Sequence, residues 1–172
     1  MDLKELTMKT IDLFAISSVD DLGAALMLCV TEKDTDKLQA FYNLIGGDLS
    51  KDWLQMIYQY YCADRKDKKQ DYTPKCLAQF LSRLIGESAE TVDMCAGSGA
   101  LTIQRWMKNP DTAFTLYEID ENVIPYLLFN MTLRNIRATI HQADILQQET
   151  ANTWEVRRGE HFGNVTCLKP SL

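Results

Sequence analysis

The chain has 172 residues and a net charge of −6, a length that suits one core, with or without a helical extension, but not two large domains. Hydrophobic residues make up 46% of it and charged residues 24%, which is typical of globular rather than disordered or fibrous proteins. No apolar run approaches the roughly 18 residues of a membrane span, and the N-terminus lacks the segments of a signal peptide. We therefore expect a cytoplasmic protein with no membrane partner.

The cysteines, histidines and charges exclude several kinds of site. The five cysteines and two histidines are far apart, without the spacing of a disulfide framework or a zinc site, so we expect reduced, mostly buried thiols and no metal. The acidic balance argues against a protein that grips DNA on a broad basic face. The one dense basic run, residues 65–69, is expected to be a solvated linker rather than a phosphate contact.

The first 63 residues predict helices. Apolar residues recur every three or four positions, as on one buried stripe per helix, in four segments that run from Leu3 to Phe14, Val19 to Leu26, Leu38 to Ile45 and Trp53 to Tyr61. Ser50 is a suitable N-cap for the fourth segment. The aromatic residues Trp53, Tyr58, Tyr60 and Tyr61 could stack on bases, but at helical spacing we expect them in the core. We assign residues 1–70 to an N-terminal helical region.

Residues 71–172 show a different pattern, which begins at the end of a polar connection, ADRKDKKQD, at residues 63–71. Thr73 and Pro74 predict the N-cap and first residue of a helix that ends at Gly86. Beyond this helix, short apolar segments alternate with helical ones, which predicts parallel strands joined by helical crossovers. The strands are expected at residues 91–95, 113–119, 138–142 and 163–168, and the helices at residues 99–107 and 121–135.

A glycine turn, CAGSGA at residues 95–100, follows the first of these strands, where open α/β sheets bind ligands. Gly97 and Gly99 allow the backbone to bend and a ligand to approach closely. Asp93 precedes the turn, and Thr102 stands where a dinucleotide-binding loop has its third glycine. Because a carboxylate repels phosphate and attracts a cation, the turn favours S-adenosylmethionine, which carries an ammonium and a sulfonium group.

Acidic residues also follow the second and third strands. Glu118 is suited to accept hydrogen bonds from both hydroxyls of a ribose. Asp144 is suited to accept one from the adenine amine, with Ile145 beside the ring. One acidic residue after a strand is common and is weak evidence for a ligand site. Acidic residues at three successive strand ends are a more specific signal, and they predict a single nucleoside site.

Five segments, DYTP, VDMCAGSGALTI, YEIDEN, NMTLRNI and ADIL, occur in the order seen in the amino-methylating DNA methyltransferases. Over residues 70–146 the chain resembles this N6-adenine DNA methyltransferase family, particularly the modification subunits of type I restriction-modification systems. The resemblance implies an α/β fold: a truncated class I, Rossmann-like methyltransferase sheet with an N-terminal helical extension. It also implies S-adenosylmethionine as cofactor and adenine amino methylation, with DNA reached through a partner subunit or domain.

The same resemblance assigns the cofactor-binding residues. The motif beside the methionine part of the cofactor matches Tyr72, Thr73 and Pro74, and the glycine loop matches Asp93, Ala96, Gly97, Ser98 and Gly99. The ribose and adenine positions match Glu118 and Ile119, and the adenine-binding turn matches Asp144, Ile145 and Leu146. The segment NMTLRN, residues 130–135, matches a packing segment with no chemical role.

One family motif is absent. Family members carry Asn or Asp, then Pro-Pro and an aromatic residue after the fourth strand, which accept the hydrogens of the target amine and stack on the flipped base. This chain has no Pro-Pro pair and carries TCLKPSL at that place. Lys169 and Ser171 cannot supply an acceptor and a stacking ring, so no catalytic residue is assigned.

The chain is therefore expected to be a fragment or a shortened relative, and three functions stay open. The first is a DNA adenine methyltransferase or its cofactor-binding portion. The second is a non-catalytic S-adenosylmethionine-binding module or partner subunit, and the third is a methyltransferase for another substrate. Arg157, Arg158 and His161, near the C-terminus, are expected to be solvated loop residues.

Overall fold

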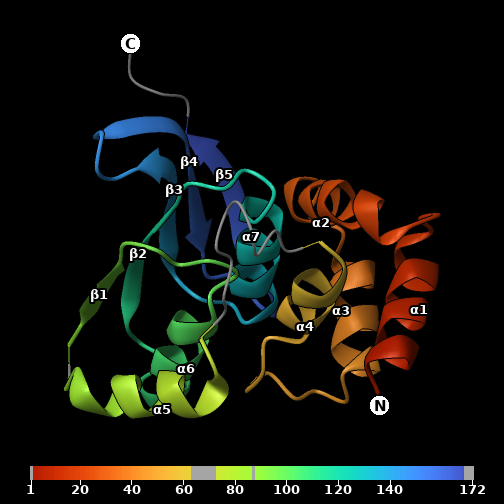
Figure 1. The fold of residues 1–172 in the computed structure, drawn as a ribbon, viewed down its shortest axis with the longest axis horizontal. Coiled ribbons are helices and arrows are strands. Elements are labelled where there is room, and N and C mark those ends of the chain that lie inside the picture. The colour runs from red at the N-terminus through yellow and green to blue at the C-terminus, as the bar shows by residue number, and fades with distance from the viewer. Residues whose placement is uncertain (1, 63–72, 87, 169–172) are drawn as a thin grey trace.

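A run of N-terminal helices is followed by strands that alternate with helices (Figure 1). The computed structural model describes residues 2–62, 73–86 and 88–168, so Tyr72, the basic run at 65–69 and residues 169–172 lie outside it. The helices are α1 (Leu3–Phe14), α2 (Leu22–Thr31), α3 (Thr35–Leu44), α4 (Trp53–Tyr61), α5 (Lys75–Leu84), α6 (Ala100–Lys108) and α7 (Ile124–Leu133), with a short 3-10 helix η1 (Val19–Asp21). The strands are β1 (Glu90–Asp93), β2 (Ala113–Glu118), β3 (Ala138–Asp144), β4 (Glu149–Arg157) and β5 (Asn164–Leu168).

The five strands form one mixed sheet in the order β1-β2-β3-β4-β5. β1, β2 and β3 are parallel, with Asp93 opposite Leu116 and Glu118 opposite Gln142. The carboxyl ends of these three strands therefore lie along one edge of the sheet, each strand reaching two residues further than the last. This confirms the mixed α/β fold and the parallel arrangement predicted for the first three strands.

The last two strands differ from the prediction. β4 and β5 pair antiparallel, because the connections at residues 145–148 and 158–163 are shorter than the dozen or so residues that a parallel crossover needs. The segment predicted as a fourth strand is β5. β4 escaped prediction because only Trp154 and Val156 of its nine residues are buried, so its apolar signal is short.

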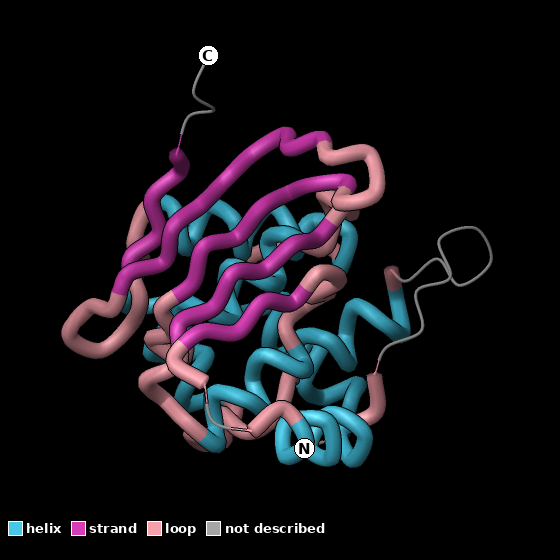
Figure 2. Tube along the Cα trace, turned by 90° about the vertical axis from the view of Figure 1, so that its left-hand side faces the viewer, coloured by secondary structure: helices cyan, strands magenta, loops and turns pink. Residues whose placement is uncertain are grey.

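The described helices gather on one face of the sheet, and the strands lie open on the other (Figure 2). Residues on β2 alternate accordingly: Phe114 and Leu116 are buried under the helices, whereas Thr115 and Tyr117 are partly exposed on the open face. On that face Tyr117 stacks on His141 of β3, with ring centroids 4.8 Å apart. Alternation of this kind is usual for a sheet with one solvated face.

Helix α7 joins the sheet to the N-terminal helices, which pack on its far side (Figure 1). All ten residues of α7 are buried. Phe129 contacts Phe14 and Phe41 edge to face, at centroid distances of 5.8 and 5.3 Å. One continuous apolar core therefore runs from the N-terminal helices through α7 to the sheet.

Several local predictions are corrected. Asp52, not Ser50, caps α4 by accepting a hydrogen bond from Gln55 N, and α5 begins at Lys75 with Pro74 as its N-cap rather than Thr73. Tyr60 and Tyr61 are exposed, although Tyr58 is in the core as expected.

The cysteines and the basic residues near the C-terminus differ in part from the prediction. Cys29 is buried and Cys62 partly so, but Cys76, Cys95 and Cys167 are exposed free thiols, so the prediction of mostly buried thiols is wrong. Arg157 belongs to β4 rather than to a loop; it is exposed, as are Arg158 and His161. No single described helix is long and apolar enough to cross a membrane. Among the described residues, one bent pair of helices, residues 3–14 and 19–31, reaches that length and apolar composition when the two helices are taken together.

Candidate ligand site at the carboxyl edge of the parallel strands

The glycine loop lies between β1 and α6 and is pressed against two neighbouring elements. Ala96 N donates to Tyr117 O at 2.9 Å, which ties the loop to β2. Gly99 caps α6 with φ of +98°, a conformation that L residues avoid. A Cβ there would lie 2.8 Å from Met131 Cε and 3.0 Å from Leu127 Cδ1 of α7. Glycine is therefore required at position 99 by both backbone and packing.

Asp93 ends β1 directly below this loop. Its Oδ1 accepts a hydrogen bond from Cys95 N at 3.1 Å. Burial raises the pKa of Asp93 above its ordinary value, and the Cys95 N–H opposes that rise. Among the described residues no lysine, arginine or histidine forms an ion pair with Asp93. A half-buried carboxylate without a counter-ion favours a cationic ligand group, which would compensate its charge.

Glu118 ends β2 and binds the glycine loop directly. Its Oε2 accepts from Gly97 N at 2.8 Å, and its Oε1 accepts from Asp120 N at 2.8 Å. The side chain is thus held in one place at the sheet edge by two backbone groups. Since each carboxylate oxygen has a second lone pair, both can still accept from a ligand hydroxyl. The structure therefore brings together the predicted residues of β1, the loop and β2.

Asp144 ends β3 beside a hollow of about 420 Å³ that Ile119, Gln142, Glu149 and Thr150 also line. Its Oδ1 accepts from Leu146 N and Gln147 N, at 2.9 and 3.1 Å. Ile119 and Leu146 are large apolar residues with 62% and 91% exposure. An acceptor beside exposed apolar surface suits a flat, amine-bearing ring. Ile119 and Asp144 thus share one hollow, whereas Ile145, which is partly buried, and Leu146, which is exposed, do not line it.

A smaller hollow, of about 170 Å³, lies where the first turns of α4, α5 and α6 meet. It is lined by Thr73 and by Asp52, Gln55, Ala100 and Gln104, among others. Thr73 therefore lies near the beginning of the helix that follows the glycine loop. Pro74 caps α5 and does not line this hollow.

The structure adds a buried polar network that the sequence did not reveal. Asn130 of α7 donates through Nδ2 to Asp52 Oδ1 at 3.0 Å and to Ser98 O of the glycine loop at 2.9 Å. Arg134 donates through NH1 to Asn130 Oδ1 at 2.8 Å and through Nε to Leu49 O at 3.0 Å. Burial lowers the pKa of Arg134 to about 10, which the carboxylates of Asp52 and Asp48 oppose.

This network links the start of α4 to the glycine loop. The sequence assigned residues 130–135 to packing alone. The available signal was the spacing of Asn130 and Arg134, two polar residues four positions apart at the end of a mostly apolar helix, which places them on one face.

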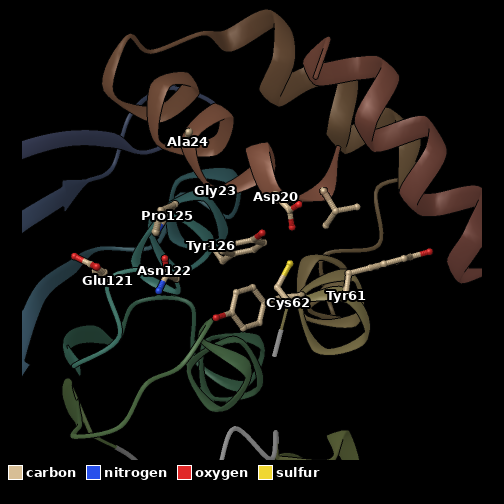
Figure 3. Close-up of a pocket in the computed structure, with 11 residues that line it drawn as sticks. Asp20, Gly23, Ala24, Tyr61, Cys62, Glu121, Asn122, Pro125 and Tyr126 are labelled. Carbon is tan, nitrogen blue, oxygen red and sulfur yellow. The ribbon is translucent and has the colours of Figure 1, made fainter. Parts of the chain in front are cut away.

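A third hollow, of about 530 Å³, lies between α2, α4 and the start of α7 (Figure 3). Figure 3 shows the Cys62 sulfur between Tyr126 and Tyr61, below Asp20. Burial raises the pKa values of both Tyr126 and Cys62, so both groups are neutral at pH 7. The described lining of this hollow holds no basic side chain and none of the residues predicted to bind a cofactor.

The groups at the sheet edge fit a nucleoside that carries a positive charge. Asp93, Glu118 and Asp144 end the three parallel strands along one edge of the sheet, and Ile119 lines the hollow beside Asp144. Such acceptors suit hydroxyl, amine and cationic groups, and they would repel a phosphate.

A family model described as N-6 DNA Methylase matches residues 48–165, more than half of the chain. The matched span begins just before α4 and ends in β5, so it includes the glycine loop and all three strand-end acids. No curated protein and no solved structure matches the chain.

Proposed function

We propose, from the premise that this chain belongs to the N-6 DNA methylase family, that it binds S-adenosylmethionine at the carboxyl edge of β1, β2 and β3. The observation that carries the proposal is the hydrogen bond of 2.8 Å that Gly97 N, in the glycine loop, donates to Glu118 Oε2 at the end of β2. It holds a glycine turn and a ribose-binding carboxylate at one point of the sheet edge. This arrangement is the one expected of a class I, Rossmann-like nucleoside site.

Each acid has a separate task in this proposal. Asp93 attracts the positively charged part of the ligand, and Glu118 accepts from the ribose hydroxyls. Asp144 accepts from the adenine amine while Ile119 covers one face of the ring. When bound, S-adenosylmethionine supplies a methyl group activated by its sulfonium. The protein's contribution is to hold that methyl in a fixed direction, because methyl transfer depends mainly on positioning.

The acceptor is proposed to be the amino group of adenine in DNA, with its binding groups supplied by a partner subunit or domain. Two observations support this. The sequence has no Pro-Pro pair from which the family's amine-binding turn could be built. In addition, β2 is the one described strand that pairs with β1, and Val92 and Met94, in and just after β1, are 57% and 61% exposed.

A second candidate function is a non-catalytic S-adenosylmethionine-binding module in a larger assembly. The missing amine-binding motif and the net charge of −6 favour it, because a DNA-gripping surface is usually basic. The two candidates share the cofactor site and differ only in turnover.

Transfer of a tritiated methyl group separates the candidates. The full chain is incubated with methyl-labelled S-adenosylmethionine and adenine-containing DNA, alone and with candidate partner subunits, and label in DNA is counted. Incorporation that depends on adenine supports the methyltransferase. Cofactor binding in the absence of any incorporation supports the module, and absence of cofactor binding contradicts both.

A further inference from the structure

The feature that the proposed function does not use is the outer side of α5. This helix turns small residues inward, since Ala78 and Ser82 are 1% and 7% exposed. Four large apolar residues, which we call the α5 stripe, are instead 45–66% exposed: Leu77, Phe80, Leu84 and Ile85. Large apolar side chains are normally the ones that a helix buries. The arrangement therefore indicates a contact surface on the outside of α5.

The spacing of the α5 stripe is that of a seam between packed helices. Leu77, Phe80 and Leu84 stand three and four positions apart, which places them on one side of the helix, and Ile85 flanks them. Gln79 and Arg83 lie outside the stripe and are also exposed. A narrow apolar stripe between polar residues is the pattern that another helix packs against.

The described part of the chain leaves this stripe open. α5 packs mainly on α6, and Figure 1 shows it at the lower edge of the molecule, away from α1, α2 and α3. Single exposed apolar residues are ordinary on protein surfaces, whereas a contiguous patch of a few hundred Å² marks an interaction site.

The size of the α5 stripe suits a small dimer interface. With roughly 200 Å² of surface for each large apolar residue, the observed exposed fractions leave about 450 Å² of the stripe in solvent. Two copies packed stripe to stripe remove about 900 Å² from water, and the residues at the rim bring the total to about 1,000–1,200 Å². This area reaches the lower end of the range for specific interfaces, so we expect a weak dimer.

The charges of α5 allow it to pair with a second copy of itself. The helix contains the basic residues Lys75 and Arg83 and no acidic residue. In a parallel pair the two Arg83 residues stand at the same level, where like charges repel. In an antiparallel pair centred between residues 80 and 81, Leu77 lies opposite Leu84 of the other copy, and the two Arg83 residues are about 7 Å apart along the helix axis. An antiparallel pair is also closed, so it produces a dimer rather than a chain of copies.

We propose that the α5 stripe is the interface of a two-fold dimer, in which α5 packs antiparallel on α5 of a second copy. The inference does not depend on the proposed function, because no ligand takes part in the contact. α5 packs on α6, the helix that begins directly after the glycine loop. The dimer therefore holds two of the proposed ligand sites in one particle.

Sedimentation equilibrium of the full chain tests the inference, over chain concentrations of about 2–200 µM. The wild-type protein is compared with Leu84→Glu, which places a charge in the stripe. Leu28→Glu is the matched control, because Leu28 is also an exposed leucine on a helix, with 52% exposure, but belongs to α2.

We expect the wild-type protein to be a monomer–dimer equilibrium with a Kd of about 1–100 µM, as for an interface of this size. Leu84→Glu should raise the Kd by at least about tenfold, because the dimer then buries two charges without partners. Leu28→Glu should change it by less than about twofold. A monomer at every concentration overturns the inference, and so does a dimer that Leu84→Glu leaves intact. Both results leave the proposed function standing.

A second measurement needs no variant, so it decides the matter even if Leu84→Glu does not fold. Amide hydrogen exchange of the wild-type protein is measured well below and well above the Kd. We expect residues 75–85 to exchange about tenfold more slowly at ten times the Kd, because the dimer suppresses local opening of α5. Residues 22–31 of α2 should keep their rates. Protection that rises in another segment and not in residues 75–85 places the contact elsewhere and overturns the inference.

Discussion

The substitution Gly99→Ala tests how the glycine loop is held. It adds a single methyl group at the N-cap of α6, at the point where the loop touches α7. Gly99 has φ of +98°, well outside the regions that alanine prefers. The new Cβ would lie 2.8 Å from Met131 Cε and 3.0 Å from Leu127 Cδ1, both on side chains that are fully buried.

Two separate costs follow from this geometry. The backbone conformation costs roughly 1–2 kcal/mol for a residue with a Cβ. Overlap with a packed core costs about 1–2 kcal/mol more, since both Met131 and Leu127 are fully buried. We therefore expect Gly99→Ala to lower the free energy of unfolding by about 2–4 kcal/mol.

Urea unfolding followed by circular dichroism measures this change, and Gly46→Ala separates the two costs. Gly46 has φ of +64°, and a Cβ there would meet nothing within 4 Å, so its substitution should cost only the backbone strain of about 1 kcal/mol. If Gly99→Ala destabilises the protein no more than Gly46→Ala does, the loop is not packed against α7 as described.

Three further changes test the site and its support. Asp93→Ala and Glu118→Ala should each weaken S-adenosylmethionine binding by about 1–3 kcal/mol in a calorimetric titration, because each removes a charged partner of the ligand. Asn130→Ala should lower the free energy of unfolding by about 2–3 kcal/mol, because it leaves Asp52, Ser98 O and Arg134 short of buried hydrogen bonds. Burial lowers the pKa of His141, so the unfolded chain takes up a proton first as the pH falls. The free energy of unfolding should therefore decrease as the pH falls through the ordinary histidine pKa of about 6.5, and it should decrease less in His141→Gln.

Each of these changes has its own control and its own contrary result. Unchanged affinity in both Asp93→Ala and Glu118→Ala contradicts the position of the site. Asn152→Ala removes an exposed side-chain hydrogen bond to Gln142 and should cost less than about 0.5 kcal/mol; a similar cost for Asn130→Ala contradicts the buried network. Identical pH profiles for the wild-type protein and His141→Gln show that His141 is not shielded from solvent.

The carboxyl edge of the parallel strands could be predicted because its signals are local. Gly97 and Gly99 mark a turn, Pro74 marks a helix start, and the acids at positions 93, 118 and 144 each end an apolar run. Parallel strands then place such residues at one edge without further information. The helical N-terminus was predictable for the same reason, since the period of its apolar residues is a property of each segment alone.

The remaining features depend on contacts between distant segments. β4 has few buried residues, and its direction is set by a short connection rather than by its own composition. The pairing of Asp52 with Asn130 joins residues 78 positions apart, and nothing in either local segment indicates it. Tyr60 and Tyr61 follow the helical spacing of core residues, yet they are exposed because α4 buries only one side.

Titration of S-adenosylmethionine into the full chain, with ATP as the comparison ligand, tests the central claim most directly. Three strand-end carboxylates beside a glycine loop favour a cationic nucleoside and oppose a triphosphate. We expect saturable binding of S-adenosylmethionine with one molecule per chain, and no heat above dilution for ATP. Binding of ATP with equal or greater affinity, or no binding of S-adenosylmethionine, would contradict the account.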